Sequence, residues 1–411
     1  MARTSPERRD CLAVLRRWSP DGAKHLDDLI SERCEGGSNR AFVQNLCYGV
    51  IRNLSLLDYW IDHLAGKGRD IDEETRAVLR AGLYELLRTR TPDHAAVNEA
   101  VNAAGRARGF VNALLRRAGR EREELEALAE EASLPIKLSH PFHLVERWRS
   151  QLGEEDAGKL CLWDQEPSPV FVRVNGLRPT PPSDLTEYGE LLTGQQGFWR
   201  VEQLPRRHLN EGDVYAQDPS TIIAPRLLDP QPGDLVLDAC AAPGGKAALM
   251  AEMMGNEGQI IACDPKPRRM EILADNLKRL GVTCATYLPV EWGNTHNLDL
   301  PKQGFDRILV DAPCTNTGVL RRRVDARWRI DSGEFARLAA VQLSILEDVA
   351  PHLSKTGSMV YSTCSLDQEE NQGVVKAFLK RNRGWVLEDE RQSLPFRHGF
   401  DGAYAALLKR G

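Results

Sequence analysis

The chain has 411 residues, of which 42% are hydrophobic and 27% are charged, and its formal net charge is −5. This length exceeds what one hydrophobic core usually serves, so two or three domains are expected. The composition is that of a globular protein, and no apolar run approaches the length of a membrane span or resembles the core of a signal peptide. These properties predict a cytoplasmic protein with no membrane contact.

Nine cysteines are scattered along the chain, and no pair of them has C-x-x-C spacing. An odd and dispersed set argues against a disulfide framework and against a zinc ribbon. We therefore expect free thiols in a reducing compartment and no bound metal.

Residues 1–133 are predicted to form a helical bundle. Apolar residues recur at helical spacing in residues 41–51, 77–87 and 95–101, and no alternating strand pattern interrupts them. An arginine-rich stretch, residues 105–120, follows. Its guanidinium groups could bind phosphate oxygens in pairs, although a solvated helix face would account for the same residues.

Residues 134–228 differ in composition from the region before them. Prolines cluster in residues 166–169 and 178–182, and residues 170–174 form a short β-like run. This pattern favours a connecting segment followed by a small mixed α/β subdomain.

Residues 229–411 alternate between short apolar runs and amphipathic helical stretches such as residues 268–278. Alternation of strand and helix predicts a parallel, doubly wound α/β sheet of Rossmann-like type. The expected strands are residues 234–238, 259–263, 285–288, 307–310 and 358–361.

A loop of small residues, Asp238-Ala-Cys-Ala-Ala-Pro-Gly-Gly-Lys246, follows the first of these strands. Such a loop can approach a ligand closely, and the next helix offers free N–H groups. The second strand ends in Asp264, where an acid can accept ribose hydroxyls. The loop matches neither the dinucleotide fingerprint nor a P-loop, and its glycines could simply serve a tight turn.

Two later strands each end in a cysteine, in the segments Asp311-Ala-Pro-Cys314 and Ser362-Thr-Cys-Ser365. The carboxyl ends of parallel strands meet at one edge of a sheet, so two thiols and a carboxylate should converge there. This favours covalent chemistry, although a single buried cysteine is more often an inert thiol. The residues alone do not say whether Cys314 or Cys364 attacks.

A second arginine cluster, residues 321–329, directly follows Cys314, which favours a role in substrate binding. Trp328 lies inside this cluster. Its ring could stack on a nucleic-acid base or pack in a core, and the sequence supports both readings equally.

The loop and the two cysteine motifs together resemble the RNA 5-methylcytosine methyltransferases. Residues 92–101 and 109–117 resemble the NusB-type RNA-binding domain of one branch, ribosomal RNA small subunit methyltransferase B, and residues 217–221 and 401–405 also match it. The resemblance therefore extends over the whole chain. It implies an all-α NusB-like domain, a small α/β subdomain and an α/β methyltransferase domain that uses S-adenosyl-L-methionine.

Roles for individual residues follow from this resemblance. It makes Cys364 the nucleophile and Cys314 the residue that assists product release, with Asp311 between the cofactor and the base. Asp264 would hold the ribose with Arg269 nearby, while Glu291 stands where the family usually has an aspartate near the adenine. The implied cofactor loop consists of Cys240, Ala241, Ala242, Pro243, Gly244, Gly245 and Lys246.

The implied reaction is methylation of cytosine carbon 5 in 16S ribosomal RNA through a covalent cysteine–carbon 6 intermediate, by a monomer. Methylation of transfer RNA is one alternative. A non-catalytic RNA-binding assembly or antitermination factor is another, although the intact Asp311, Cys314 and Cys364 argue against it. A dehydrogenase is disfavoured because its dinucleotide fingerprint is missing.

Overall fold

The computed structural model describes residues 4–34, 39–66, 68–195, 197–293, 298 and 300–411. They form two compact units. The first, here called the N-terminal unit, comprises Met1–Pro167 and Leu320–Ile330. The second, here called the sheet unit, comprises Ser168–Val319 and Asp331–Gly411.

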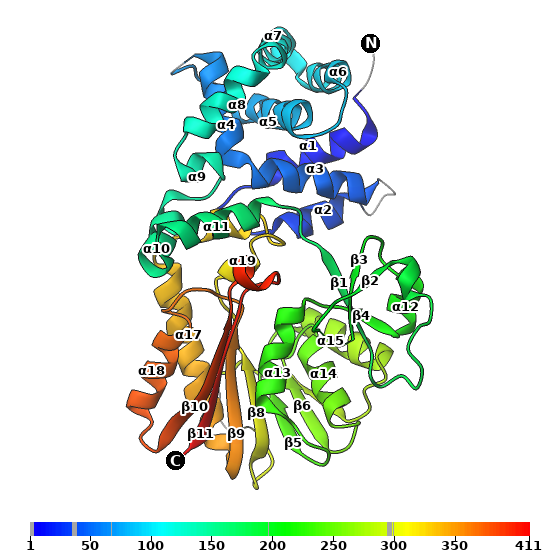
Figure 1. Ribbon diagram of the computed structural model, residues 1–411, viewed down its shortest axis with the longest axis vertical. Coiled ribbons are helices and arrows are strands. Elements are labelled where there is room, and N and C mark those ends of the chain that lie inside the picture. The colour runs from blue at the N-terminus through cyan, green and yellow to red at the C-terminus, as the bar shows by residue number, and fades with distance from the viewer. Residues whose placement is uncertain (1–3, 35–38, 67, 196, 294–297, 299) are drawn as a thin grey trace. The chain divides into compact units, whose positions relative to one another are not determined.

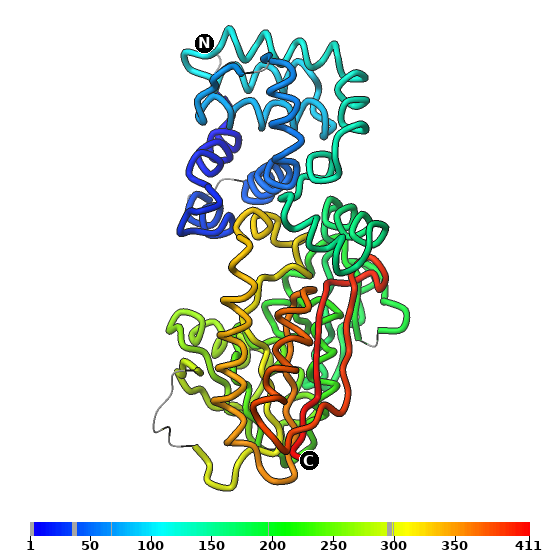
Figure 2. The backbone as a smooth tube through the Cα atoms, turned by 90° about the vertical axis from the view of Figure 1, so that its left-hand side faces the viewer, coloured from blue at the N-terminus to red at the C-terminus, as the bar shows by residue number. Residues whose placement is uncertain are grey.

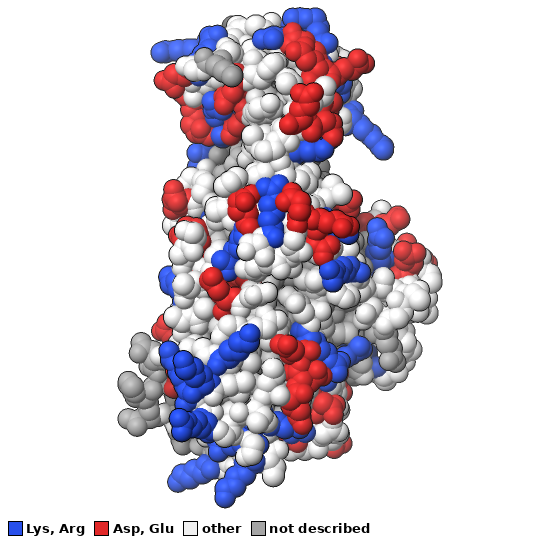
Figure 3. All heavy atoms as spheres, turned by 60° about the vertical axis from the view of Figure 1, so that its left-hand side comes forward, with Lys and Arg blue, Asp and Glu red and all other residues white. Residues whose placement is uncertain are grey.

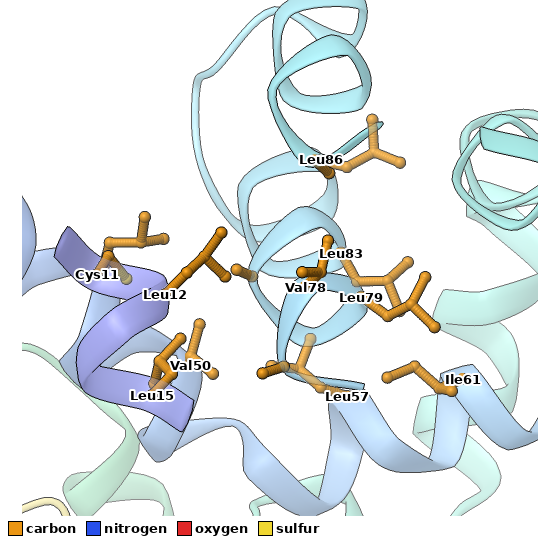
Figure 4. Close-up of a cluster of buried hydrophobic side chains, with 14 of the residues drawn as sticks. Cys11, Leu12, Leu15, Val50, Leu57, Ile61, Val78, Leu79, Leu83 and Leu86 are labelled. Atoms are coloured by element: carbon orange, nitrogen blue, oxygen red, sulfur yellow. The ribbon is translucent and has the colours of Figure 1, made fainter. Parts of the chain in front are cut away.

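The N-terminal unit is helical, as predicted (Figure 1). Its core is built from apolar side chains that several helices contribute, among them Leu12, Val50, Leu57 and Leu83 (Figure 4). The described helices are α1 (Pro6–Arg17), α2 (Leu26–Cys34), α3 (Arg40–Arg52), α4 (Leu54–Ala65), α5 (Glu73–Arg88), α6 (Asp93–Ala103), α7 (Arg108–Arg120), α8 (Arg122–Glu131), α9 (Leu134–Lys137), α10 (Phe142–Leu152), α11 (Glu154–Gln165) and α16 (Ala326–Arg329).

The segment Leu320–Ile330 completes this core. Val324 is fully buried among the helices, and Asp325 Oδ2 accepts a hydrogen bond from the Leu26 amide at 3.1 Å, at the start of α2. Trp328 packs against the same core and donates from Nε1 to the Ile51 carbonyl at 3.0 Å. The structure thus favours packing over base stacking for Trp328.

The second arginine cluster is not a uniform phosphate-binding surface, which corrects the prediction for residues 321–329. Arg327 is fully buried. Its guanidinium donates to the carbonyl oxygens of Ser139, Asp164 and Leu320. Arg321 is also buried, and it donates to the Pro167 carbonyl at 2.8 Å. These two side chains hold backbone segments together and are turned away from solvent.

Two sheets form the framework of the sheet unit. A four-stranded antiparallel sheet has the order β2-β3-β1-β4, and a seven-stranded sheet has the order β10-β11-β9-β8-β5-β6-β7. The strands are β1 (Val170–Val174), β2 (Gly189–Leu191), β3 (Phe198–Val201), β4 (Val214–Ala216), β5 (Leu235–Asp238), β6 (Gln259–Cys263), β7 (Ala285–Leu288), β8 (Phe305–Asp311), β9 (Leu353–Thr363), β10 (Trp385–Ser393) and β11 (Ala403–Arg410).

The five predicted strands β5 to β9 are parallel, which confirms the doubly wound sheet. The sequence did not predict the long antiparallel hairpin of β10 and β11, which pairs with β9 through β11 (Figure 2). Chain order reverses at β5, because β6 and β7 lie on one side of it and β8 on the other. Ligands of such sheets bind at this point, outside the carboxyl ends of the strands.

Helices cover both faces of the large sheet, so its central strands are apolar on both sides. Val236 of β5 packs on one face with α13 (Ile223–Leu228), α14 (Gly245–Met253) and α15 (Pro267–Arg279). The next residue, Leu237, packs on the other face with α17 (Glu334–Val349) and α18 (Gln372–Arg381). Two shorter helices complete the unit, α12 (Arg206–Glu211) and α19 (Pro395–His398).

The compact units and the predicted segments divide the chain differently. Helices α9 to α11 of the predicted segment 134–228 belong to the N-terminal unit, and α13 of that segment packs on the large sheet. No helix among the described residues combines the length and apolar composition that a bilayer crossing requires.

Candidate active site

The loop between β5 and α14 turns sharply at its two glycines. Gly244 caps α14 with a φ of 109°, in the left-handed region that favours glycine. A Cβ atom on Gly245 would lie 2.8 Å from Cε1 of Tyr215, so no larger residue fits there without a shift. The loop therefore depends on both glycines for different reasons.

A cavity of about 210 Å³ opens beside this loop. It receives six residues of the predicted cofactor loop and also Asp311 from the end of β8. It is lined by Tyr215, Ala216, Gln217, Asp218, Thr221, Asp238, Cys240, Ala241, Ala242, Pro243, Gly245, Lys246 and Asp311.

One wall of the cavity, residues 215–221, was not predicted as a binding surface, although the motif Gln217-Asp-Pro-Ser-Thr221 could have indicated it. The buried Arg173 fixes the side chain of Gln217, because Arg173 Nε donates to Gln217 Oε1 at 2.7 Å. Asp218 accepts from the amide of Asp401 at 3.2 Å, which ties this wall to the start of β11.

Asp238, at the end of β5, was quoted in the loop motif but given no role. It is fully buried, lines the cavity, and neither carboxylate oxygen has a side-chain hydrogen-bond partner among the described residues. Burial, followed by the charge of Asp311, raises the pKa of Asp238 to about 7. A cationic ligand group would satisfy this carboxylate.

Lys246 and Asp311 form an ion pair inside the cavity, with Nζ 2.6 Å from Oδ2. Burial alone would lower the pKa of Lys246. The charge of Asp311 and its hydrogen bond outweigh this effect, so the pKa of Lys246 is raised. The ammonium group is therefore retained, and the pair places a proton donor at the cavity wall.

Asp264, Arg269 and Glu291 do not line this cavity. Asp264 is buried at the end of β6, where it accepts from the Lys266 amide at 3.0 Å and pairs with Arg269 at 3.2 Å. Arg269 also donates to the Ala242 carbonyl of the loop at 2.7 Å. Glu291 is exposed. Their contacts with a nucleoside remain predictions.

The structure brings the two predicted thiols together. Cys314 Sγ lies 3.2 Å from Cys364 Sγ, although 50 positions separate them in the chain. The hydrogen bond to Cys364, followed by burial, raises the pKa of Cys314 well above its usual value. Cys314 therefore keeps its proton in this pair, an arrangement that suits a thiol donor beside a reacting sulfur.

A network of buried hydrogen bonds fixes the positions of the two loops that carry Cys314 and Cys364. Glu370 accepts from the Thr315 amide at 3.0 Å and from Gln342 Nε2 at 2.9 Å. The Gly318 amide donates to the Cys364 carbonyl at 2.9 Å. A Cβ atom on Gly318 would lie 2.6 Å from that oxygen, so glycine permits the close approach.

Comparisons with known proteins identify the family of this chain. A family model described as 16S rRNA methyltransferase RsmB/F matches residues 225–409, and the NusB family model matches residues 6–120. The probable ribosomal RNA small subunit methyltransferase B of Bacillus subtilis is 32% identical over 94% of each chain. The chain belongs to the ribosomal RNA small subunit methyltransferase B family. The enzyme of that name from Escherichia coli O127:H6 is 35% identical over 90% of this chain and 91% of its own.

A crystal structure of a methyltransferase homologue from Pyrococcus horikoshii has a TM-score of 0.58 and 26% identity, covering 68% of this chain and 98% of its own. These findings confirm the predicted family, the helical NusB-type domain and the Rossmann-like methyltransferase domain. Membership of the ribosomal RNA small subunit methyltransferase B family makes the chain a methyltransferase with a NusB-type helical domain.

Proposed function

We propose that the protein transfers a methyl group from S-adenosyl-L-methionine to carbon 5 of a cytosine in small-subunit ribosomal RNA. The observation that carries this proposal is the pair of thiols 3.2 Å apart at the ends of β8 and β9, in the unit whose cavity contains the Lys246–Asp311 ion pair. Relatives named ribosomal RNA small subunit methyltransferases support the RNA substrate.

The cavity suits S-adenosylmethionine in its polarity. Within the described part of the chain the buried Asp238 carboxylate has no side-chain partner, and it matches the ammonium of the methionine part, next to the loop of Cys240 to Lys246. S-adenosylmethionine supplies an electrophilic methyl group carried by a sulfonium. We assign the ribose to Asp264 with Arg269 beside it, and the contact near the adenine to Glu291.

The chemistry at cytosine needs a nucleophile because carbon 5 of the ring is weakly nucleophilic. The Cys364 thiol loses its proton and its sulfur bonds to carbon 6, which converts the ring into an enamine with a proton on N3. The Lys246–Asp311 pair holds the proton that N3 requires. Carbon 5, now electron-rich, would then bond to the methyl group as the bond from that methyl group to the sulfonium sulfur breaks, and the neutral thioether would be the leaving group.

Release requires three further changes. The proton on carbon 5 leaves, the proton on N3 returns to the Lys246–Asp311 pair, and the S–C6 bond breaks, so that its electron pair returns to the Cys364 sulfur, which regains its proton. Cys314 assists this elimination from its position beside Cys364. Over the cycle the base gains one methyl group and one proton is released.

The N-terminal unit contributes RNA contacts in this proposal. Arg117 is already paired with Glu121 at 2.8 Å, whereas Arg106, Arg116 and Arg120 are exposed around α7. Acidic and basic side chains are interspersed on the face of this unit in Figure 3. The exposed arginines therefore bind phosphate singly and do not form one continuous basic surface. Phosphate contacts of this kind weaken as salt rises. The protein acts as a monomer in this proposal.

Bisulfite sequencing of ribosomal and transfer RNA, from cells with and without the gene, tests the substrate. A small-subunit ribosomal cytosine that loses its methyl group without the gene supports the proposal. Loss in transfer RNA would instead support the transfer RNA alternative. Unchanged methylation in both, together with no methyl transfer by the purified protein, would favour the non-catalytic assembly factor.

A further inference from the structure

Asn316 lies between the two cysteine loops and has no role in the function described so far. Its backbone φ is 64°, in the left-handed region where glycine is the least strained residue. Its side chain bridges the two thiol residues: Nδ2 donates to the Cys314 carbonyl at 2.9 Å, and Oδ1 accepts from Cys364 Sγ at 3.2 Å.

The orientation of this amide follows from its partners. The Cys314 carbonyl can only accept a hydrogen bond, so the group facing it must be the NH₂ of Asn316. A flipped amide would set two oxygen acceptors against each other. Oδ1 is therefore the atom that faces the Cys364 sulfur.

This orientation decides which group donates and which accepts in the hydrogen bonds that connect Cys314, Cys364 and Asn316. Oδ1 of Asn316 accepts the S–H of Cys364, which leaves the lone pairs of that sulfur as acceptors for the S–H of Cys314. The raised pKa of Cys314 agrees with a proton that stays on its sulfur. The row of hydrogen bonds thus runs from Cys314 through Cys364 to Asn316.

We propose that Asn316 is a positioning residue that orients the Cys364 thiol for attack and directs the Cys314 S–H toward it. The proposal rests on the proposed cytosine chemistry and adds a specific residue to it. The competing explanation is that asparagine merely tolerates the left-handed backbone of a turn.

Asn256 offers a matched control for that explanation. It belongs to the same unit, has a φ of 61°, and its side chain also bridges backbone groups, donating to the Gly281 carbonyl and accepting from the Thr283 amide. Neither contact involves the cysteine loops. Asn256→Gly therefore makes the same chemical change in the same backbone conformation, away from the thiols.

The first experiment compares Asn316→Gly with Asn256→Gly in the full chain. The substrates are a 16S ribosomal RNA transcript for methyl transfer and the same transcript with 5-fluorocytidine for trapping the covalent adduct. Asn316→Gly should slow adduct formation about 10- to 100-fold, the loss typical of a mispositioned reacting group, with KM for the cofactor changed less than about twofold. Asn256→Gly should leave both unchanged.

The second measurement does not depend on RNA. Iodoacetamide labelling of Cys364, followed by peptide mass spectrometry, should be at least about threefold faster in Asn316→Gly, because no acceptor holds the thiol hydrogen. The melting temperature should not fall, since glycine suits this φ. Labelling and adduct rates equal to those of the unmodified protein would overturn the positioning role.

Asn316→Asp adds a signature that a purely structural residue would not produce. A neutral carboxyl reproduces both hydrogen bonds of the amide, whereas a carboxylate cannot donate to the Cys314 carbonyl and repels a thiolate. The activity of this variant, divided by that of the unmodified protein at each pH, should rise as pH falls from 8 to 6. A flat ratio contradicts the proposal.

The two measurements separate the inference from the function on which it rests. If the unmodified protein forms no RNA adduct but Cys364 labelling still responds to Asn316→Gly, the positioning role stands and the cytosine chemistry fails. If the adduct forms at the same rate in both proteins, the chemistry stands and the positioning role fails.

Discussion

A pair of neighbouring thiols lies in each unit of the protein, and the two pairs differ in burial and in polar neighbours. Cys11 and Cys47 lie 3.3 Å apart in the helical core, and both are fully buried. Cys314 and Cys364 lie 3.2 Å apart at two strand ends, and both are partly exposed. Burial, followed by the hydrogen bond to Cys47, raises the pKa of Cys11 well above its usual value.

Short sulfur–sulfur distance is therefore not a sign of chemistry in this chain. The helical pair is fully buried among apolar side chains, so its thiols serve packing. The strand-end pair has an amide acceptor in Asn316 and stands at the ligand-binding edge of the sheet. Access and polar neighbours distinguish a reactive thiol from an inert one.

The largest expected difference between the two pairs appears when one thiol is removed from each. Cys364→Ala should lower methyl transfer by at least about 10³-fold, because the nucleophile is lost, while calorimetry shows nearly unchanged cofactor affinity. Cys47→Ala should leave the rate of methyl transfer within about twofold. Substantial turnover by purified Cys364→Ala would refute its assignment as nucleophile.

The second-largest expected effect comes from removing Cys314, and it distinguishes the roles of the two strand-end thiols. Cys314→Ala should slow release by about 10²–10⁴-fold, since losing a positioned acid–base group typically has this effect. A covalent protein–RNA adduct should then survive denaturing electrophoresis, and the Cys314→Ala, Cys364→Ala double variant should show none. An adduct trapped by Cys364→Ala instead would make Cys314 the nucleophile.

A third test concerns the buried carboxylate of Asp238, which lines the cavity of the sheet unit. Its folded pKa is raised to about 7, so Asp238 takes up a proton as pH falls through that value. Because an ammonium binds the carboxylate form, cofactor affinity should be full above pH 7 and decline below it. Asp238→Asn should weaken binding at pH 8 by about 1.5–3 kcal/mol and flatten this pH profile. Calorimetry from pH 6 to pH 8 measures both, and a steep profile in Asp238→Asn would place the titrating group elsewhere.

The smallest expected effect concerns the stability of the helical core. Cys47→Ala removes a fully buried sulfur and should lower the free energy of unfolding by about 1 kcal/mol. Urea unfolding of the full chain, followed by a probe in the N-terminal unit, measures it. A stability loss with unchanged methyl transfer is the expected combination. A large loss of activity at unchanged stability would contradict the packing role of this pair.

Several features of the fold could be predicted from local sequence. The helical periodicity of the first 130 residues and the strand–helix alternation after Gly233 correspond to the observed units. The thiols at residues 314 and 364 were expected to converge because parallel strands present their carboxyl ends at one edge. The sharp turn of the loop from Cys240 to Lys246 was predictable because its small residues permit it.

Other features depend on contacts between distant residues. The arginine cluster after Cys314 suggested phosphate binding, but Arg327 donates to three backbone carbonyls inside the helical unit. The sequence of residues 321–329 does not indicate these hydrogen bonds, because the carbonyls that accept them come from other segments. The amide of Asn316 beside Cys364 was missed for the same reason, whereas the cavity wall at residues 215–221 was missed although its motif could have indicated it.

The sequence by itself determined the helical first part, the strand–helix alternation of the large sheet, the family and the residue types of the site, since these depend on periodicity and on motifs within short segments. Only the tertiary structure distinguished features that look alike in the sequence. It placed one thiol pair at the sheet edge and the other in the helical core. It left members of one arginine cluster exposed and buried members of the other. The physical reason is that burial and hydrogen-bond partners set the reactivity of a thiol and the availability of a charge. Both are properties of the packed chain.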